Sequence, residues 1–224
     1  MCGRFSMAED FTVLEKLFDL EPIDFPLKPR YNIAPTQDVP VVLWDNGRRL
    51  KLFRWGLIPS WAKDPAIGNK MINARAETID QKPSFKNLLN KKRCLILADG
   101  FYEWEKRGRK KIPYRIILKD KRPFAFAGLY DLWRSPEGRN VYSCTIITTM
   151  ANALVARVHE RMPVILKDDI ISLWLDSTIS DFNLLKSFLV PYPEVEMDMY
   201  EVTPLVNSPQ NDSPLCFEPL VKLF

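Results

Sequence analysis

Short apolar runs separated by charged or glycine-containing turns fill the middle of this chain, and they restrict its fold more than any other feature. Asp45, Asn46 and Gly47 lie between two such runs, and this turn chemistry predicts a hairpin with strands at 39–44 and 49–55. Further runs follow as MINARAE, CLILADGFYEW, YRIIL, FAFAGLY and YSCTIITT, and some are joined by the charged turns KRGRKK and KDKRP. The middle of the chain is therefore predicted to be mostly β-sheet.

Helical patterns are short by comparison. Ser6 and Glu9 have the spacing of a capping box ahead of apolar residues with a helical period, which predicts a first helix over 7–18. Three more helices are predicted over 83–90, 167–176 and 181–189. The chain contains 18 Pro and only 8 Gly, which favours many short elements joined by stiff turns.

These elements predict an α+β fold in which a curved antiparallel or mixed sheet, or a barrel, is flanked by short helices. No internal repeat or low-complexity linker divides the sequence, so we expect a single domain over 1–224. With 46% hydrophobic and 27% charged residues, the composition is that of a water-soluble globular protein. No stretch approaches 18 consecutive apolar residues, and MCGRFSMAED lacks the features of a signal peptide, so a cytoplasmic protein without membrane contact is expected.

The sequence gives no indication of a metal or a nucleotide cofactor. The four cysteines form no CxxC pair and no cluster with histidine, which argues against a zinc site, and disulfides are not expected in the cytosol. There is no Walker P-loop, no GxGxxG motif and no zinc-finger spacing. A formal charge of +4 permits an anionic partner without identifying one. We therefore predict no cofactor and, by default, a monomer.

Cys2 is the first candidate for chemistry. Initiator Met is generally removed before a small residue, so the mature chain is expected to begin with Cys2, a 1,2-aminothiol. An α-amine has a pKa of about 7.7–8.0, so about a tenth or more of it is neutral and nucleophilic at pH 7. Such an amine attacks aldehydes, and the adjacent thiol can close the imine to a thiazolidine. The alternative is an incidental small residue at a frayed terminus.

Three polar segments could support that chemistry. Strand alternation in MINARAE places Asn73, Arg75 and Glu77 on one face, where an amide and a guanidinium suit a hydroxyl and a phosphate; an exposed edge with a salt bridge is the alternative. Glu103 shares a strand face with Phe101, and it becomes a general acid only if that face is the inner one. His159, the single histidine, lies in the polar bend ARVHERMP, where it is catalytic or structural.

Features that suit nucleic acid are present but are not specific. Five cations occupy the six positions 106–111, which is typical of a phosphate-binding loop or of a solvated hairpin tip. Trp55 and Trp61 flank the proline turn of WGLIPSW, and aromatic residues beside basic loops can stack on unpaired bases.

Taken together, the motifs of the chain resemble those of the SOS-response-associated peptidase family, whose members process abasic sites. The motifs are, in order, MCGRF, RYNIAPTQ, WGLIPSW, INARAET, DGFYEW, TTMAN, VHERMP, VTPLVNS and NDSPLC. The resemblance implies a barrel-like α+β domain that recognises abasic sites in single-stranded DNA and binds them covalently through the N-terminal cysteine. It also implies association with the nucleoid when DNA is damaged.

The resemblance assigns roles to individual residues. It implies catalytic functions for Cys2, Asn73, Glu103 and His159, phosphate contacts for Arg4 and Arg75, and stacking beside the lesion for Trp61. Trp55 and, in RYNIAPTQ, Asn32 and Pro35 complete the expected DNA-binding set. Some relatives carry a second Trp after the position of Trp61, where this chain has Ala62.

Two other functions remain open at the level of sequence. Cys2 could be the nucleophile of a cysteine hydrolase or peptidase that acts without DNA, with its own amine or His159 as the base. Alternatively, the chain could be a non-catalytic single-strand binder that relies on Trp55, Trp61 and the 106–111 loop. An AP-lyase side reaction and self-processing of Met1 are further activities that the resemblance implies.

Overall fold

The strands fall into two sheets, and the computed structural model describes residues 2–220. The first sheet closes into a mixed five-stranded barrel because β10 pairs with both β4 and β9. Its members are β3 (Asp38–Trp44), β4 (Arg48–Trp55), β6 (Arg93–Ala98), β9 (Phe124–Arg134) and β10 (Asn140–Met150). Only the β10–β4 contact among these five is parallel, and it pairs Ser143 with Arg54 and Cys144 with Trp55. Three short strands extend this sheet: β5 (Asn73–Arg75), β11 (Arg161–Pro163) and β12 (Ile165–Leu166).

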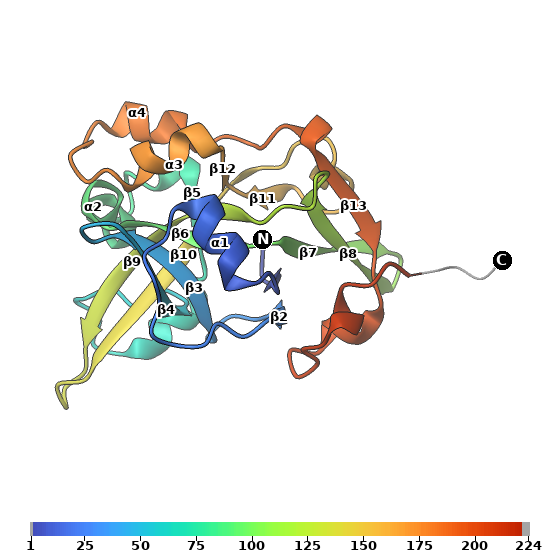
Figure 1. The fold of residues 1–224 in the computed structure, drawn as a ribbon, viewed down its shortest axis with the longest axis horizontal. Coiled ribbons are helices and arrows are strands. Elements are labelled where there is room, and N and C mark those ends of the chain that lie inside the picture. The colour runs from blue at the N-terminus through green and yellow to red at the C-terminus, as the bar shows by residue number, and fades with distance from the viewer. Residues whose placement is uncertain (1, 221–224) are drawn as a thin grey trace.

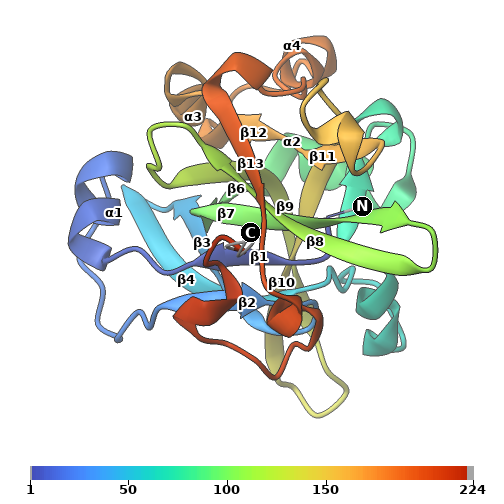
Figure 2. The ribbon, with the colours of Figure 1, turned by 90° about the vertical axis from the view of Figure 1, so that its right-hand side faces the viewer.

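The second sheet is antiparallel and has the strand order β13-β8-β7-β1-β2. Its strands are β1 (Phe5–Met7), β2 (Arg30–Ile33), β7 (Gly100–Arg107), β8 (Lys110–Leu118) and β13 (Met197–Glu201). Figure 1 shows this sheet to the right of the barrel, and Figure 2 shows the long β7–β8 hairpin from the side. Asp99 alone separates β6 from β7, so one continuous segment passes from the barrel into the second sheet.

Aromatic packing joins the two sheets. Phe5 of β1 lies edge-on to Trp55 of β4 and to Phe126 of β9, at ring-centroid distances of 5.1 and 5.7 Å. A smaller apolar cluster lies on the other face of β7 and consists of Tyr102, Val202, Val206 and Cys216. Both faces of β7 are therefore covered at this point. The α+β, barrel-like fold expected from the sequence is confirmed.

The helices lie where the sequence predicts them, with one exception. They are α1 (Phe11–Phe18), α2 (Pro83–Lys91), α3 (Asp168–Leu175) and α4 (Phe182–Ser187). Short 3₁₀ turns occur in the connecting segments and after β13: η1 (Pro65–Lys70), η2 (Ala76–Thr78), η3 (Val155–Arg157), η4 (Glu194–Glu196), η5 (Pro204–Asn207) and η6 (Pro214–Cys216). The helices α2 and α3 contact the β6–β9 side of the barrel (Figure 1). No helix within residues 2–220 is long and apolar enough to cross a membrane.

The exception is the first helix, which begins at Phe11 rather than at residue 7. The predicted capping box does not form, because Ser6 is fully buried in β1 and its hydroxyl donates to Asp99 at 2.6 Å. Asp10 caps the helix instead, and its carboxylate accepts from the backbone N–H of Thr12 at 2.8 Å. A short strand therefore precedes the helix and joins the N-terminal segment to the second sheet.

Candidate active site

Cys2 lies between the two sheets because the pairing of β1 with β7 continues toward the N-terminus. Beyond the paired residues Phe5 and Phe101, the backbone N–H of Tyr102 donates to the carbonyl of Arg4 at 2.9 Å. Cys2 is fully buried, and its thiol contacts the carbonyl of Arg4 at 3.7 Å. Burial, followed by the negative charge of Glu103, raises the pKa of this thiol well above its ordinary value. Cys2 thus holds a protonated thiol at neutral pH.

Asn73 fixes the backbone of Cys2 from the barrel side. Its side-chain amide donates to the carbonyl oxygen of Cys2 at 2.8 Å, and its own Oδ1 is buried with no protein partner within residues 2–220. Asn73 begins β5, which runs parallel to β10 with Asn73 opposite Ile146. The amide predicted to contact a ligand hydroxyl therefore faces the first residue of the described chain.

Glu103 occupies the inner face of β7, which is the placement that makes it usable as an acid. The residue is only 3% exposed, and burial raises the pKa of its carboxyl from 4.5 to about 7. Its charge acts on the Cys2 thiol, as the raised pKa of that thiol shows. Glu103 can therefore exist in both protonation states near neutral pH, close enough to Cys2 for its charge to act on the thiol.

His159 lies in the loop between η3 and β11, and its ring is fixed by the backbone. The N–H of Arg161 donates to Nδ1 at 2.9 Å. A backbone N–H can only donate, so Nδ1 is the acceptor and the neutral ring carries its proton on Nε2. Burial lowers the pKa of His159 below its ordinary value of 6.5, so the neutral ring predominates at pH 7.

Glu103 and His159 line the same open pocket, which has a volume of about 540 Å³. This volume is within the usual range for small-molecule sites. Its remaining walls are Trp104, Lys106, Lys111 and Asn207. The structure thus brings together Cys2, Asn73, Glu103 and His159, the four residues that the sequence predicted as catalytic.

Arg161 is a residue that the sequence analysis missed, although it stands two positions after His159 in VHERMP. Its guanidinium makes a bidentate ion pair with Glu77 at 2.9 and 3.0 Å and donates to the carbonyl of Thr148 at 2.7 Å. These bonds hold the segment whose backbone N–H orients His159. The H-x-R spacing was the available signal. Arg75, at the end of β5, is exposed at the surface beside this group.

Two of the predicted DNA contacts are part of an internal clamp. Asn32 is fully buried, accepts from Arg4 Nη1 at 2.7 Å, and donates to the carbonyls of Val206, Ser208 and Asn211. The amide of Asn32 is engaged inside the protein in this conformation, so a DNA contact through Asn32 stays a prediction. Arg4 is 9% exposed and also donates to the carbonyl of Val206, so a phosphate contact through Arg4 stays a prediction.

The two tryptophans of WGLIPSW differ sharply in exposure. Trp55 is fully buried against Phe5 and donates from its indole N–H to the carbonyl of Ile72, so it cannot stack on a base without opening the core. Trp61 is 60% exposed, so its stacking on an unpaired base stays a prediction that this exposure permits. Pro35, in the turn before β3, is partly exposed. A DNA contact through Trp55 stays a prediction, and the burial of this side chain does not favour it.

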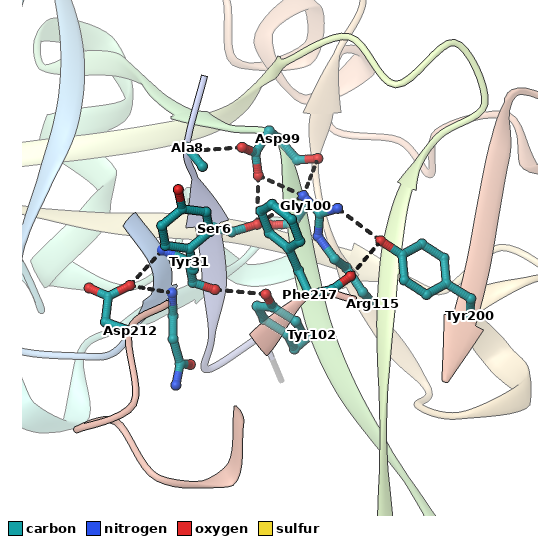
Figure 3. A network of polar contacts seen from close by, with 11 residues as sticks. Ser6, Ala8, Tyr31, Asp99, Gly100, Tyr102, Arg115, Tyr200, Asp212 and Phe217 are labelled. Carbon is teal, nitrogen blue, oxygen red and sulfur yellow. Dashed lines mark hydrogen bonds and ion pairs between the residues drawn. The ribbon is translucent and has the colours of Figure 1, made fainter. Parts of the chain in front are cut away.

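A buried polar network holds β1, and therefore the N-terminal segment, in place (Figure 3). The carboxylate of Asp99 accepts from the Ser6 hydroxyl, from the backbone N–H of Ala8 and from the guanidinium of Arg115. Arg115 in turn donates to the hydroxyl of Tyr200, so β1, β8 and β13 meet at one ion pair. This network lies on the face of β7 opposite Glu103, and it supports the site without lining it.

Comparisons with known proteins agree with this arrangement. The family model "SOS response associated peptidase (SRAP)" matches residues 1–209. The chain is 49% identical over 222 residues to "Abasic site processing protein YoqW" of Bacillus subtilis, covering 97% of this chain and 99% of that one. It is 35% identical over 226 residues to "Abasic site processing protein HMCES" of Gallus gallus, covering 86% and 67% of the two chains.

A solved structure gives the same result at the level of the fold. A crystal structure of a protein from Bacteroides thetaiotaomicron superposes with a TM-score of 0.89 at 30% identity, covering 98% of this chain and all of that one. The family match spans the residues that build the site around Cys2, Asn73, Glu103 and His159. The chain therefore belongs to the SOS-response-associated peptidase family.

Proposed function

We propose that this protein processes abasic sites in single-stranded DNA and captures them as a thiazolidine on Cys2. The observation that carries the proposal is the position of the buried Cys2, held by Asn73 and next to a carboxyl whose pKa is about 7. The names of the relatives, which are abasic site processing proteins, support the abasic-site processing part of the proposal. Removal of Met1 is required first, and Met1 itself lies outside the described residues.

The α-amine of Cys2 makes the first bond. A ring-opened abasic sugar carries an aldehyde, and the neutral amine adds to its carbon to give a carbinolamine. The thiol is the poorer first nucleophile here, because burial keeps it protonated. The order of attack is therefore amine first and sulfur second.

Glu103 supplies and removes the protons. In its neutral form it protonates the hydroxyl of the carbinolamine, which leaves as water and gives the iminium ion and a Glu103 carboxylate. That carboxylate then takes the thiol proton as the sulfur bonds to the iminium carbon, which closes the five-membered ring. One proton leaves Glu103 and one returns, so the carboxyl ends in its starting state.

His159 and Asn73 hold the opened sugar. The neutral His159 ring lines the pocket, and the buried Oδ1 of Asn73 offers an acceptor to a hydroxyl that enters the site. Trp61 stacks on a neighbouring base, and the exposed Arg75 binds a phosphate. A second phosphate contact is assigned to Arg4, whose guanidinium also donates to Asn32 and to the carbonyl of Val206.

Two further activities belong to the same intermediate and the same terminus. Before the ring closes, the iminium ion acidifies the adjacent carbon, so β-elimination of the 3′ phosphate gives an AP-lyase side reaction. The family name also suggests that the site releases Met1 itself. The mass of the purified chain, with and without Glu103→Gln, distinguishes self-processing from removal by another peptidase.

The test is to mix the protein with a single-stranded oligonucleotide that carries one abasic site, beside an intact control, and to run a denaturing gel after heating. A heat-stable shifted band is expected only with the lesion and only when Cys2 is present. Cys2→Ala is the control, and intact mass verifies that both proteins have lost Met1. If the protein that begins with Cys2 gives no shifted band, the crosslinking proposal fails and the cysteine-hydrolase alternative is favoured.

The Cys2→Ser variant tests the role of the thiol separately from that of the α-amine. This variant keeps the α-amine, so we expect an imine that borohydride traps, but no band that survives heating without the reductant. Gel analysis with and without borohydride measures both species. A heat-stable band from Cys2→Ser without reductant would contradict the role of sulfur in closing the ring.

A further inference from the structure

We propose that Lys106, Lys111 and the side-chain amide of Asn207 form a phosphate-binding site that holds the DNA backbone beside the active site. This inference rests on the proposed function and gives a role to three residues that the catalytic chemistry does not use; Asn207 belongs to the motif VTPLVNS, whereas the two lysines lie outside the motifs. All three line the pocket that contains Glu103 and His159.

The two lysines form a cross-strand pair in the β7–β8 hairpin. Lys106 lies directly opposite Lys111, and like charges at directly opposed positions destabilise a sheet. No carboxylate among residues 2–220 makes an ion pair with either ammonium group. The neighbouring Arg107, by contrast, pairs with Glu105 at 2.7 Å. Two facing, uncompensated cations therefore remain at the pocket, and an anion would relieve their repulsion.

Asn207 adds a donor of fixed orientation. Its Oδ1 accepts from the indole N–H of Trp104 at 2.7 Å, so its NH₂ group is left to donate. The segment that carries it is held in turn, because the carbonyl of the preceding residue, Val206, accepts from Arg4 at 2.6 Å. The pocket thus contains an N–H donor in addition to the two lysines, and all three groups favour the same kind of ligand, an oxyanion.

The distance from the reacting group suits a phosphate of the same strand. Lys106 follows Glu103 by three residues on β7, so their Cα atoms are roughly 10 Å apart. Both side chains line the same pocket. The pocket of about 540 Å³ is also larger than a bare deoxyribose requires. The sugar therefore lies at Glu103, and a backbone phosphate of an adjoining nucleotide lies between Lys106, Lys111 and Asn207.

The test measures binding without chemistry, using a single-stranded oligonucleotide that carries a tetrahydrofuran abasic analogue and therefore no aldehyde. Fluorescence anisotropy over a range of salt concentrations gives the slope of log K against log salt. Lys106→Gln/Lys111→Gln is compared with wild type and with Lys119→Gln/Lys121→Gln. The control pair removes the same charge just beyond the other end of β8, roughly 25 Å away.

We expect the Lys106→Gln/Lys111→Gln variant to bind more weakly at low salt, with a slope smaller by about 0.7, because it loses one single-strand phosphate contact and each such contact contributes about 0.7. The control pair should keep the slope of wild type. Equal slopes for all three proteins, or equal losses in both variants, would overturn the proposal. Asn207→Asp keeps the acceptor for Trp104 but replaces the donor with a carboxylate, so several-fold weaker binding is expected; wild-type affinity would remove the amide from the site.

A parallel arm uses a true abasic oligonucleotide and the denaturing gel. If wild type forms no covalent band while the anisotropy result holds, the crosslinking function fails and the phosphate site stands. If wild type crosslinks while the lysine variant keeps the wild-type salt slope, the phosphate site fails and the function stands.

Discussion

Glu103 and His159 show how burial alone can prepare a site for proton transfer at neutral pH. Burial favours the neutral form of each group, so it raises the pKa of the carboxyl and lowers that of the imidazole. Neither effect needs a metal or a nearby counter-charge. The sequence could not decide the orientation of Glu103, because Tyr102 on the opposite face of β7 is as deeply buried as Phe101.

The first prediction concerns the pH dependence of crosslinking. The raised pKa of Glu103 means that its acidic form is lost as the pH rises through about 7, while the neutral amine increases toward pH 8. The wild-type rate should therefore pass through a maximum near these values. Glu103→Gln has no proton to lose, so we expect the falling limb near pH 7 to vanish and the maximal rate to drop by a factor of about 100 or more.

Initial rates between pH 5 and 9, measured on denaturing gels, test this prediction. Glu105→Gln is the control, because Glu105 is on the same strand but pairs with Arg107 at the surface. A profile for Glu103→Gln that matches wild type in both shape and height would remove Glu103 from the proton transfers.

The second prediction concerns Trp55 and Trp61, which flank the same proline turn in the sequence but should respond differently to substitution. Trp61→Ala should weaken binding of an abasic-analogue strand by about 1–3 kcal/mol, which is the usual value of one base–aromatic stack, with no effect on folding. Trp44, with an exposed fraction of 61% against 60% for Trp61, is the matched control. Trp55→Ala should instead destabilise the fold by about 3–5 kcal/mol, because it leaves a cavity in the core.

Anisotropy and urea unfolding measure the two effects separately. Affinity losses that are equal for Trp61→Ala and Trp44→Ala would show that no specific stack forms. The sequence could not predict that Trp55 is buried and Trp61 exposed. The reason is that Trp55 is the last residue of β4, whereas Trp61 lies beyond the turn that follows this strand.

Among the elements, β1 is the strand on which the active site depends. It has only three residues, yet it pairs with both β2 and β7 and carries Cys2 on its N-terminal extension. Asp99 holds it through the Ser6 hydroxyl and the N–H of Ala8. Because Asp99 also forms a largely buried ion pair with Arg115, the strand and the sheet depend on the same carboxylate.

The third prediction follows from that dependence. Asp99→Ala should lower the free energy of unfolding by about 3–5 kcal/mol, because it leaves Arg115 buried without its carboxylate. Asp45→Ala is the control, since the exposed pair of Asp45 with Lys51 at 3.4 Å should contribute less than about 1 kcal/mol. Urea denaturation compares the two variants, and similar losses would show that the Asp99 network is not the anchor of β1.

Local patterns predicted most of these elements, and contacts distant in sequence explain the rest. The hairpin at 45–47, three helices and the β7–β8 hairpin follow from turn residues and periodicity within a few positions. The capping box of Ser6 and Glu9 was overridden by Asp99, which no local pattern links to Ser6. Likewise Glu77 leaves the strand of Asn73 and Arg75, because a 3₁₀ turn begins at Ala76 and Arg161 binds the carboxylate.

For the molecule as a whole, Asn32 connects the two ends of the described chain. Its amide joins Arg4, near the N-terminus, to the carbonyls of Val206, Ser208 and Asn211 near the C-terminus. The same C-terminal segment supplies Asn207 to the pocket. The motif RYNIAPTQ indicated a functional site. Its asparagine, Asn32, is buried and holds the C-terminal segment that forms part of the pocket.

The fourth prediction tests this connection. Asn32→Ala should cost at least about 3 kcal/mol, because it leaves several buried polar groups without partners at about 1–3 kcal/mol each. It should also make the 204–217 segment the first to be cut in limited proteolysis. Asn69→Ala, an exposed asparagine that accepts from Arg54, is the control. Unchanged cleavage of 204–217 in Asn32→Ala would show that other contacts hold the segment.

The position of Cys2 between β7 and the barrel sets the order in which the site can be assembled during synthesis. Cys2 is among the first residues to leave the ribosome, whereas the residues of β7, with which β1 pairs, are made much later. The clamp at Arg4 and the pocket beside Glu103 also need residues 206–211, which are made later still. A partly made chain therefore exposes an aminothiol that has no acid beside it and no walls around it. Contacts this distant in sequence also slow folding. Selective capture of an aldehyde begins only when the chain is nearly finished, because the acid and the pocket walls are in place only in the complete fold.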